Sequence, residues 1–87
     1  MIYGSDPKKA ASNLEKHGVA FSEIERFQWE TALVEVDDRR DYGEQRWRAL
    51  GLIGNRVHVV VFTKRRTVRL ISLRKANRKE VSAYVER

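Results

Sequence analysis

The 87-residue sequence contains no cysteine, which excludes disulfide bonds, thiolate catalysis and cysteine-based zinc sites. No apolar run approaches the roughly 20 residues that a helix needs to span a bilayer. The N-terminal segment also lacks the basic start and apolar stretch of a secretion signal. Together these absences predict a cytoplasmic protein that does not enter the membrane.

The motifs of the common cofactor sites are missing as well. The two histidines, His17 and His58, stand alone, without the His-x-His or Glu-x-x-His spacing of a metal site. The five glycines form no phosphate-binding loop and no Gly-x-Ser-x-Gly turn. We therefore expect no metal and no other cofactor. Among common reactions this leaves acid–base chemistry on a phosphodiester, because the 2′-hydroxyl of RNA is its own nucleophile.

The charge of the chain is unevenly distributed. Residues 1–43 hold six Lys or Arg against nine Asp or Glu, a net charge of −3. Residues 44–87 hold twelve against three, a net charge of +9. A half-chain this basic attracts nucleic-acid phosphates or an acidic protein partner.

The length predicts one domain, residues 1–87, with a helical first part. Asp6 and Pro7 are typical of a helix start, and Gly18 of a helix end. A second, shorter helix is expected from Ser22, where Ser-x-x-Glu resembles a capping box. Its buried side would consist of Phe21, Ile24 and Phe27.

In the second part of the chain, apolar and polar residues alternate with a period of two, which predicts strands. The expected strands are 32–36, 46–53, 56–63 and 67–73, and Ile2 and Tyr3 suffice only for a very short one. Asn77 caps a closing helix whose apolar stripe includes Tyr84. The predicted fold is α+β: an antiparallel sheet of about four strands, with an N-terminal helical hairpin and a C-terminal helix on one face.

Basic side chains gather on two of the predicted strands and on the closing helix. Arg46 and Arg48 share one strand face, and Trp47 lies on the other. Arginine grips a phosphate through parallel N–H bonds, and an aromatic ring stacks on an unpaired base. For a single arginine an ion pair is a commoner role than binding a phosphate. For Trp47, packing against the sheet is a commoner role than stacking on a base. The other candidates for RNA contact are Arg69, Arg74, Lys75, Arg78 and Lys79.

Three residues are candidates for proton transfer. Glu44 is the only acid between Asp41 and Glu80, and its alternative role is a salt bridge to Arg46 or Arg48. Tyr84 has a hydroxyl that could reach the sheet edge, although packing alone also explains it. His17 is a reserve candidate, with helix capping or core packing as its alternative.

Three ordered segments resemble the BrnT toxins. Residues 6–21 are similar to the Asp-Pro-x-Lys…Lys-His-Gly-Val-x-Phe opening of that family. Residues 41–47 match its Gly-Glu-x-Arg-Trp segment. Residues 68–80 match its Arg-x-Ile-Ser-Ala-Arg-Lys-Ala-Thr…Glu close, which is followed by a tyrosine, here Tyr84. The departures are Leu73 for Ala, Asn77 for Thr, and Gly4-Ser5 where the family often has an aromatic residue.

The resemblance implies a ribonuclease toxin of a type II toxin–antitoxin system, with a fold similar to the RelE toxins. It also implies a BrnA-like antitoxin that carries the DNA-binding domain, with two toxins on an antitoxin dimer. The leading hypothesis is therefore a metal-independent endoribonuclease. Arg46, Arg69 and Arg74 would stabilise charge, Glu44 and Tyr84 would transfer protons, and the antitoxin would cover residues 69–84. The alternatives are a non-catalytic nucleic-acid-binding module and a protein-interaction domain.

Overall fold

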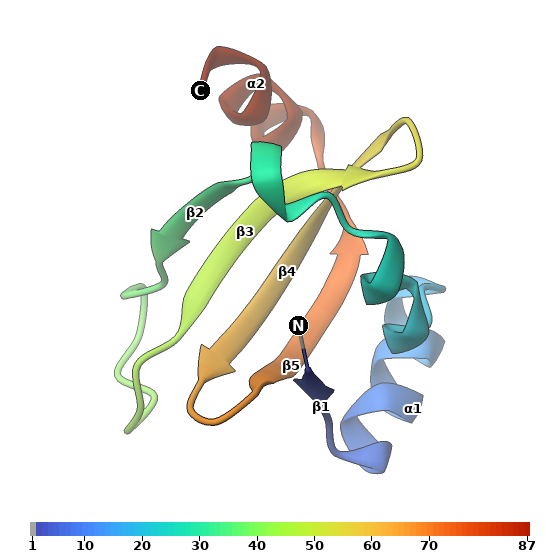
Figure 1. The fold of residues 1–87 in the computed structure, drawn as a ribbon, viewed down its shortest axis with the longest axis vertical. Coiled ribbons are helices and arrows are strands. Elements are labelled where there is room, and N and C mark those ends of the chain that lie inside the picture. The colour runs from blue at the N-terminus through green and yellow to red at the C-terminus, as the bar shows by residue number, and fades with distance from the viewer. Residues whose placement is uncertain (1) are drawn as a thin grey trace.

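The computed structural model describes residues 2–87 as a single sheet flanked by short helices (Figure 1). The elements in chain order are β1 (Tyr3–Gly4), α1 (Pro7–His17), the 3-10 helices η1 (Phe21–Arg26) and η2 (Trp29–Thr31), β2 (Leu33–Val36), β3 (Trp47–Ile53), β4 (Arg56–Lys64), β5 (Val68–Lys75) and α2 (Arg78–Glu86). The four strands expected between residues 32 and 73 are confirmed to within two residues at each end. No helix within residues 2–87 has the length and apolar character to cross a membrane.

The sheet has five strands in the order β1-β5-β4-β3-β2. Strands β2 to β5 are antiparallel neighbours, as the sequence predicts, but β1 runs parallel to β5 through the pairs Tyr3↔Val68 and Gly4↔Arg69. The very short strand considered at Ile2 and Tyr3 forms as β1, one residue later, but the predicted sheet of about four strands, all antiparallel, is wrong because the sheet has five strands and one parallel pair. A strand of two residues has no readable period, and its partner lies about 65 positions along the chain, so only the folded structure reveals the pair.

Helix α1 has the predicted ends. The carboxylate of Asp6 accepts a hydrogen bond from the Lys8 N–H at 2.9 Å, and Gly18 ends the helix with a φ of 70°. The buried side chain of Asn13 then ties the helix to β5. Its amide donates to the Leu73 carbonyl at 2.7 Å and accepts from the Leu73 N–H at 3.0 Å, which mimics a neighbouring strand at this part of the sheet edge.

The predicted second helix forms as a 3-10 helix, and its capping box is absent. Helix η1 begins after Ala20, without a side-chain hydrogen bond at its start. Glu23, which is not the acid of the expected box, forms an ion pair with Arg26 at 2.9 Å. Phe21, Ile24 and Phe27 are buried as expected. Their spacing of three residues matches the three residues per turn of a 3-10 helix, which places all three side chains on one side.

Each face of the sheet has its own apolar core, so the prediction that all helices cover one face is wrong. Helix α1 and η1 enclose one face, where Phe21 and Phe27 meet Ala49, Val60 and Phe62. A smaller core on the other face is formed by Leu50, Val57, Val59, Ala76 and Tyr84, under α2. Neighbouring strand residues alternate between the two cores because successive side chains point to opposite faces.

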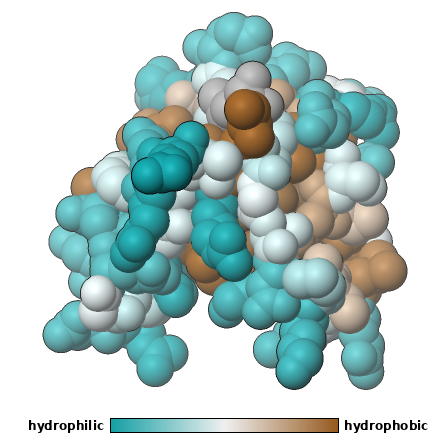
Figure 2. Space-filling model, turned by 60° about the horizontal axis from the view of Figure 1, so that its bottom comes forward, coloured by the Kyte–Doolittle hydropathy of each residue, from teal (hydrophilic) through white to brown (hydrophobic). Residues whose placement is uncertain are grey.

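A close contact inside the larger core depends on glycine. A Cβ atom at Gly51 would lie 2.5 Å from Cζ of Phe27, so only glycine admits that ring against β3. The hairpin turn that follows is formed as predicted, with a φ of 62° at Gly54. At the other end of the sheet, the β2–β3 loop and the β4–β5 turn are covered mostly by hydrophilic side chains (Figure 2).

Candidate functional site

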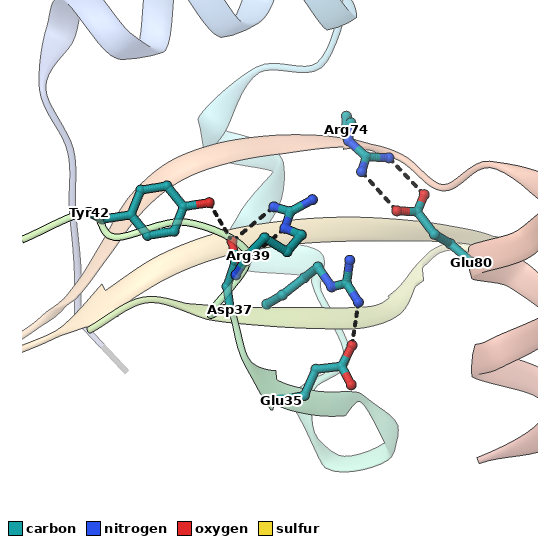
Figure 3. A network of polar contacts seen from close by, with 7 residues as sticks. Glu35, Asp37, Arg39, Tyr42, Arg74 and Glu80 are labelled. Atoms are coloured by element: carbon teal, nitrogen blue, oxygen red, sulfur yellow. Dashed lines mark hydrogen bonds and ion pairs between the residues drawn. The ribbon is translucent and has the colours of Figure 1, made fainter. Parts of the chain in front are cut away.

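Three arginines project from the sheet face that α2 covers at one end. Arg48 lies on β3, Arg74 on β5, and Arg39 reaches over the sheet from the loop after β2 (Figure 3). We call these three residues the arginine cluster. Each of them is held by a carboxylate, namely Glu35, Glu80 and Asp37 respectively. The cluster therefore places three guanidinium groups of fixed orientation on one surface.

Asp37 anchors Arg39 from beneath. Its side chain is 1% exposed, and it accepts bonds from Nε and Nη2 of Arg39 at 2.7 and 2.9 Å. The Tyr42 hydroxyl donates to the same carboxylate at 3.4 Å. The hydrogen bonds from Arg39 lower the pKa of Asp37 despite its burial, and the charge of Arg48 adds to this effect. Arg39 itself remains 56% exposed, so its guanidinium is both fixed and accessible.

Glu80 anchors Arg74 and also caps α2. Both of its oxygens accept bonds from Arg74, each at 2.8 Å, and its Oε1 accepts the Asn77 N–H at 2.9 Å. Asn77 accepts the Glu80 N–H in return, which confirms the predicted cap at Asn77 and completes a capping box. The bonds to Glu80 raise the pKa of Arg74, and the nearby charge of Arg39 opposes this rise. Conversely, the bonds from Arg74 lower the pKa of Glu80.

Arg48 completes the cluster on the central part of the sheet. It is paired across the ladder with Glu35 on β2, and the two side chains form an ion pair. Beside it lies a pocket of about 280 Å³, lined by Arg48, Leu50, Asn77, Lys79, Glu80 and Ala83. This pocket connects the cluster to the first turn of α2, where a phosphate or a short side chain has room to enter.

Arg46 and Glu44 lie together beside the cluster. The Glu44 carboxylate accepts a bond from Arg46 Nε at 3.4 Å, and the Arg46 guanidinium lies 4.1 Å from the centre of the Tyr42 ring. The salt bridge that the sequence offered as the alternative role of Glu44 is therefore present. Arg69 is exposed on β5, where it pairs with Thr63 of β4 and Gly4 of β1.

The remaining basic candidates stand near α2 and are open to solvent. Lys75 ends β5, and Arg78 and Lys79 form the first turn of α2. Tyr84, by contrast, is buried, and its hydroxyl accepts a bond from Arg87 at 3.2 Å. The Arg87 guanidinium also lies 3.8 Å from the centre of its ring. Tyr84 is therefore packed in the smaller core, which is the alternative role that its sequence pattern offered.

Two candidates are separated from the arginine cluster. Trp47 points to the opposite face, where its ring stacks on Phe62 with centroids 6.3 Å apart and lies 4.8 Å from the Lys64 ammonium. His17 ends α1 and lines a pocket against β5 with Lys9 and Lys16. The structure thus brings Arg48 and Arg74 together and leaves these two residues elsewhere.

The site residues expected from the sequence do not include Asp37 and Arg39, which lie in the polar segment between the expected strands 32–36 and 46–53. A usable signal was present, because the alternation of β2 continues past its end. Leu33, Glu35 and Asp37 share one face, so an acid in register with the strand was a candidate partner for a basic side chain. No group of three His, Cys, Asp or Glu side chains within residues 2–87 is arranged to hold a metal ion.

The fold and the paired arginines describe a small α+β protein with a basic, ordered face. A family model described as "Ribonuclease toxin, BrnT, of type II toxin-antitoxin system" matches residues 6–80. The chain therefore belongs to the BrnT family of ribonuclease toxins, which confirms the resemblance seen in its motifs.

The fold is also similar to a solved structure, that of the ribonuclease toxin BrnT of Brucella abortus. The similarity has a TM-score of 0.67 at 24% sequence identity, and it covers 90% of this chain and 100% of the other. Among curated proteins no match is found.

Proposed function

We propose that this protein is a metal-independent endoribonuclease of the cytoplasm that acts as a toxin and has a fold of the RelE type. The observation that carries the proposal is the arginine cluster, in which the guanidinium groups of Arg39, Arg48 and Arg74 share one sheet face. A phosphodiester undergoing cleavage gains negative charge on its oxygens, and fixed cationic donors stabilise that charge. The membership of the chain in a family of ribonuclease toxins supports the same substrate.

In the proposed reaction the 2′-oxygen of RNA attacks the adjacent phosphorus and the bond to the 5′-oxygen breaks. The products are a 2′,3′-cyclic phosphate and a free 5′-hydroxyl, whose oxygen takes a proton from water as it leaves. The cluster grips the phosphate, and Arg46 and Arg69 extend the positive surface to either side. Glu44, with a side chain 34% exposed beside Arg46, is the proposed acceptor of the 2′-hydroxyl proton. Lys75, Arg78 and Lys79 are proposed to hold flanking phosphates.

The test is cleavage of labelled single-stranded RNA by the purified protein. Replacing Arg46 and Arg74 together by Ala should reduce cleavage strongly, while Arg40→Ala with Arg56→Ala removes the same charge from residues outside the proposed site. Equal losses for both pairs would overturn the site. Abolition of cleavage by EDTA would overturn the metal-independent mechanism, and a retained band shift without shortened products would favour a binding module.

We further propose that a BrnA-like antitoxin neutralises the protein, with two toxins on an antitoxin dimer. Contact with DNA would then be indirect, through the antitoxin. The proposed contact surface is residues 69–84. Acidic side chains of the antitoxin would shield the arginines on this surface, and its apolar side chains would cover α2. Exposed Arg78 and Lys79 on that helix suit an acidic partner, and Val85 beyond them is 69% exposed.

Charge reversal tests this contact surface. Arg78→Glu with Lys79→Glu should slow association with the antitoxin, whereas Glu23→Lys with Glu25→Lys on η1 should not. The opposite pattern would place the antitoxin on the helical side of the molecule. The mass of the purified complex tests the stoichiometry directly.

A further inference from the structure

A second basic site lies on the side of the molecule away from α2, between α1 and β5. It is a pocket of about 190 Å³ whose lining includes Lys9, Asn13, Lys16, His17 and Ser72. We call it the α1 pocket. The helical residues that line it are spaced three and four positions apart, so they share one side of α1 and face β5.

The cations of the α1 pocket have no carboxylate partner. None of the ion pairs found within residues 2–87 involves Lys9, Lys16 or His17, and no acidic residue lines the pocket. The arginines of the cluster, in contrast, are each neutralised by an acid. Two unpaired ammonium groups around one hollow create a local excess of positive charge, which favours an anionic ligand. The His17 imidazole adds a ring that can form hydrogen bonds on the same lining.

The floor of the pocket is rigid. Asn13 is 5% exposed and its side chain makes three hydrogen bonds, two with Leu73 and one to the carbonyl of Val19 at 3.0 Å. These bonds hold α1 at a fixed separation from β5. Two serine hydroxyls, from Ser12 and Ser72, line the same hollow and are available as donors. Ammonium groups together with hydroxyl donors are a chemistry that binds phosphate oxygens.

Strand β5 connects the pocket to the arginine cluster. Ser72, on the pocket lining, lies two positions from Arg74, and Arg69 lies three positions before Ser72. A ligand that leaves the cluster across the outer part of β5 therefore meets the α1 pocket next. The lining has one large apolar side chain, Ile71, whereas protein interfaces generally need apolar or aromatic anchors.

We propose that the α1 pocket binds a backbone phosphate of the RNA whose scissile phosphate lies at the arginine cluster. The inference rests on the proposed ribonuclease function, and it adds that the enzyme contacts its substrate on both sides of β5. His17 would then be an RNA-binding residue remote from the reacting atoms.

The experiment measures binding of 2′-O-methyl RNA of about 20 nucleotides, which lacks the nucleophile and cannot be cleaved. The pocket variant is Lys9→Gln with Lys16→Gln. The matched control is Lys8→Gln with Arg56→Gln, which removes the same charge outside the pocket. The pocket variant should bind about tenfold more weakly, and its salt slope should fall by about 0.7, the value for one lost phosphate contact on a single strand. A probe of about four nucleotides should bind both variants alike.

The outcomes separate this inference from the function on which it rests. If the unchanged protein neither binds nor cleaves RNA, both proposals fail. If it cleaves RNA and the pocket variant binds the long probe as the control does, only the pocket proposal fails. If the pocket variant keeps its RNA affinity but loses neutralisation by the antitoxin, the pocket is a protein contact and the proposal is overturned.

Discussion

The arginine cluster and the α1 pocket are both basic, but they hold their charges in opposite ways. Arg39, Arg48 and Arg74 are each bound to a carboxylate, whereas Lys9 and Lys16 take part in none of the ion pairs that the structure describes within residues 2–87. Pairing fixes the direction of a guanidinium before any ligand arrives and so avoids the cost of ordering it later. An unpaired lysine keeps its full charge but also its rotamer freedom.

This difference separates the roles that the two surfaces suit. A fixed donor is suited to a transition state, whose charge must be met in one geometry. A mobile ammonium group is suited to a flexible nucleic-acid backbone, where attraction matters more than orientation. If pairing, rather than positive charge alone, distinguishes the cluster, a change at a paired residue should have a larger effect on cleavage than the same change at an unpaired one.

The largest effect is expected from Arg39→Ala. Loss of one fixed cationic donor at the cluster should reduce the rate constant for RNA cleavage by about 100-fold. Arg40→Ala is the control, since Arg40 is the exposed neighbour and belongs to none of the ion pairs within residues 2–87. Similar rates for the two variants in a single-turnover assay would show that net charge alone matters.

A large effect on stability is expected from Gly51→Ala, on the face of the sheet without the cluster. The added methyl group would meet the Phe27 ring at 2.5 Å, and overpacking of this kind costs about 1–3 kcal/mol. Denaturant unfolding should show the loss, and Phe27→Leu in the same chain should recover part of it. The account would be contradicted if the double variant lost more free energy of unfolding than the two single variants lose when their losses are added.

Asp37→Asn should lower the free energy of unfolding by about 1–3 kcal/mol at neutral pH, because a buried partner of Arg39 is weakened. The fold lowers the pKa of Asp37 from its ordinary value of 3.8, so its stabilising effect is present above that value. The effect is lost as pH falls through the lowered pKa in the folded state. The gap between the variant and the unchanged protein should therefore close below about pH 4.

The control for this measurement is Asp38→Asn, at the exposed next position. It should leave both the stability at neutral pH and the shape of the acid-unfolding curve nearly unchanged. A constant gap for Asp37→Asn at all pH values would mean that its charge does not contribute to stability.

The smallest effect is expected from Glu35→Gln, which releases Arg48. The side chains of this pair are 44% and 26% exposed, so its loss should change the free energy of unfolding by less than about 1 kcal/mol. RNA affinity should rise slightly because a carboxylate no longer competes with phosphate for Arg48. A fall in affinity would show that orientation of Arg48 by Glu35 outweighs its neutralisation.

Local signals in the sequence predicted most of the elements. The ends of α1 follow from Asp6, Pro7 and Gly18, and the capping box of α2 follows from Asn77 and Glu80, because these devices use residues within one turn of each other. The Ser22 capping box failed because the three-residue spacing of Phe21, Ile24 and Phe27 favours a 3-10 helix against the sheet.

The candidate site was only partly predictable. Arg48 and Arg74 were found because basic residues concentrate in the second half of the chain. Arg39 was missed because its importance depends on Asp37, whose burial arises from the loop that folds over the sheet. Trp47 could be assigned to the face opposite the arginines by alternation alone.

The sequence by itself determined where most helices and strands lie, the excess of positive charge in residues 44–87 and the family motifs. These properties depend on neighbours along the chain, so they can be read without a fold. The tertiary structure alone decided the parallel pairing of β1, the division into two cores, the pairing of Arg48 with Glu35, the burial of Asp37 beside Arg39, and the convergence of α1 and β5 around the α1 pocket. The physical reason is that burial, strand pairing and the ion pair between Glu35 and Arg48 arise between separate segments of the chain, and their geometry exists only once those segments have packed.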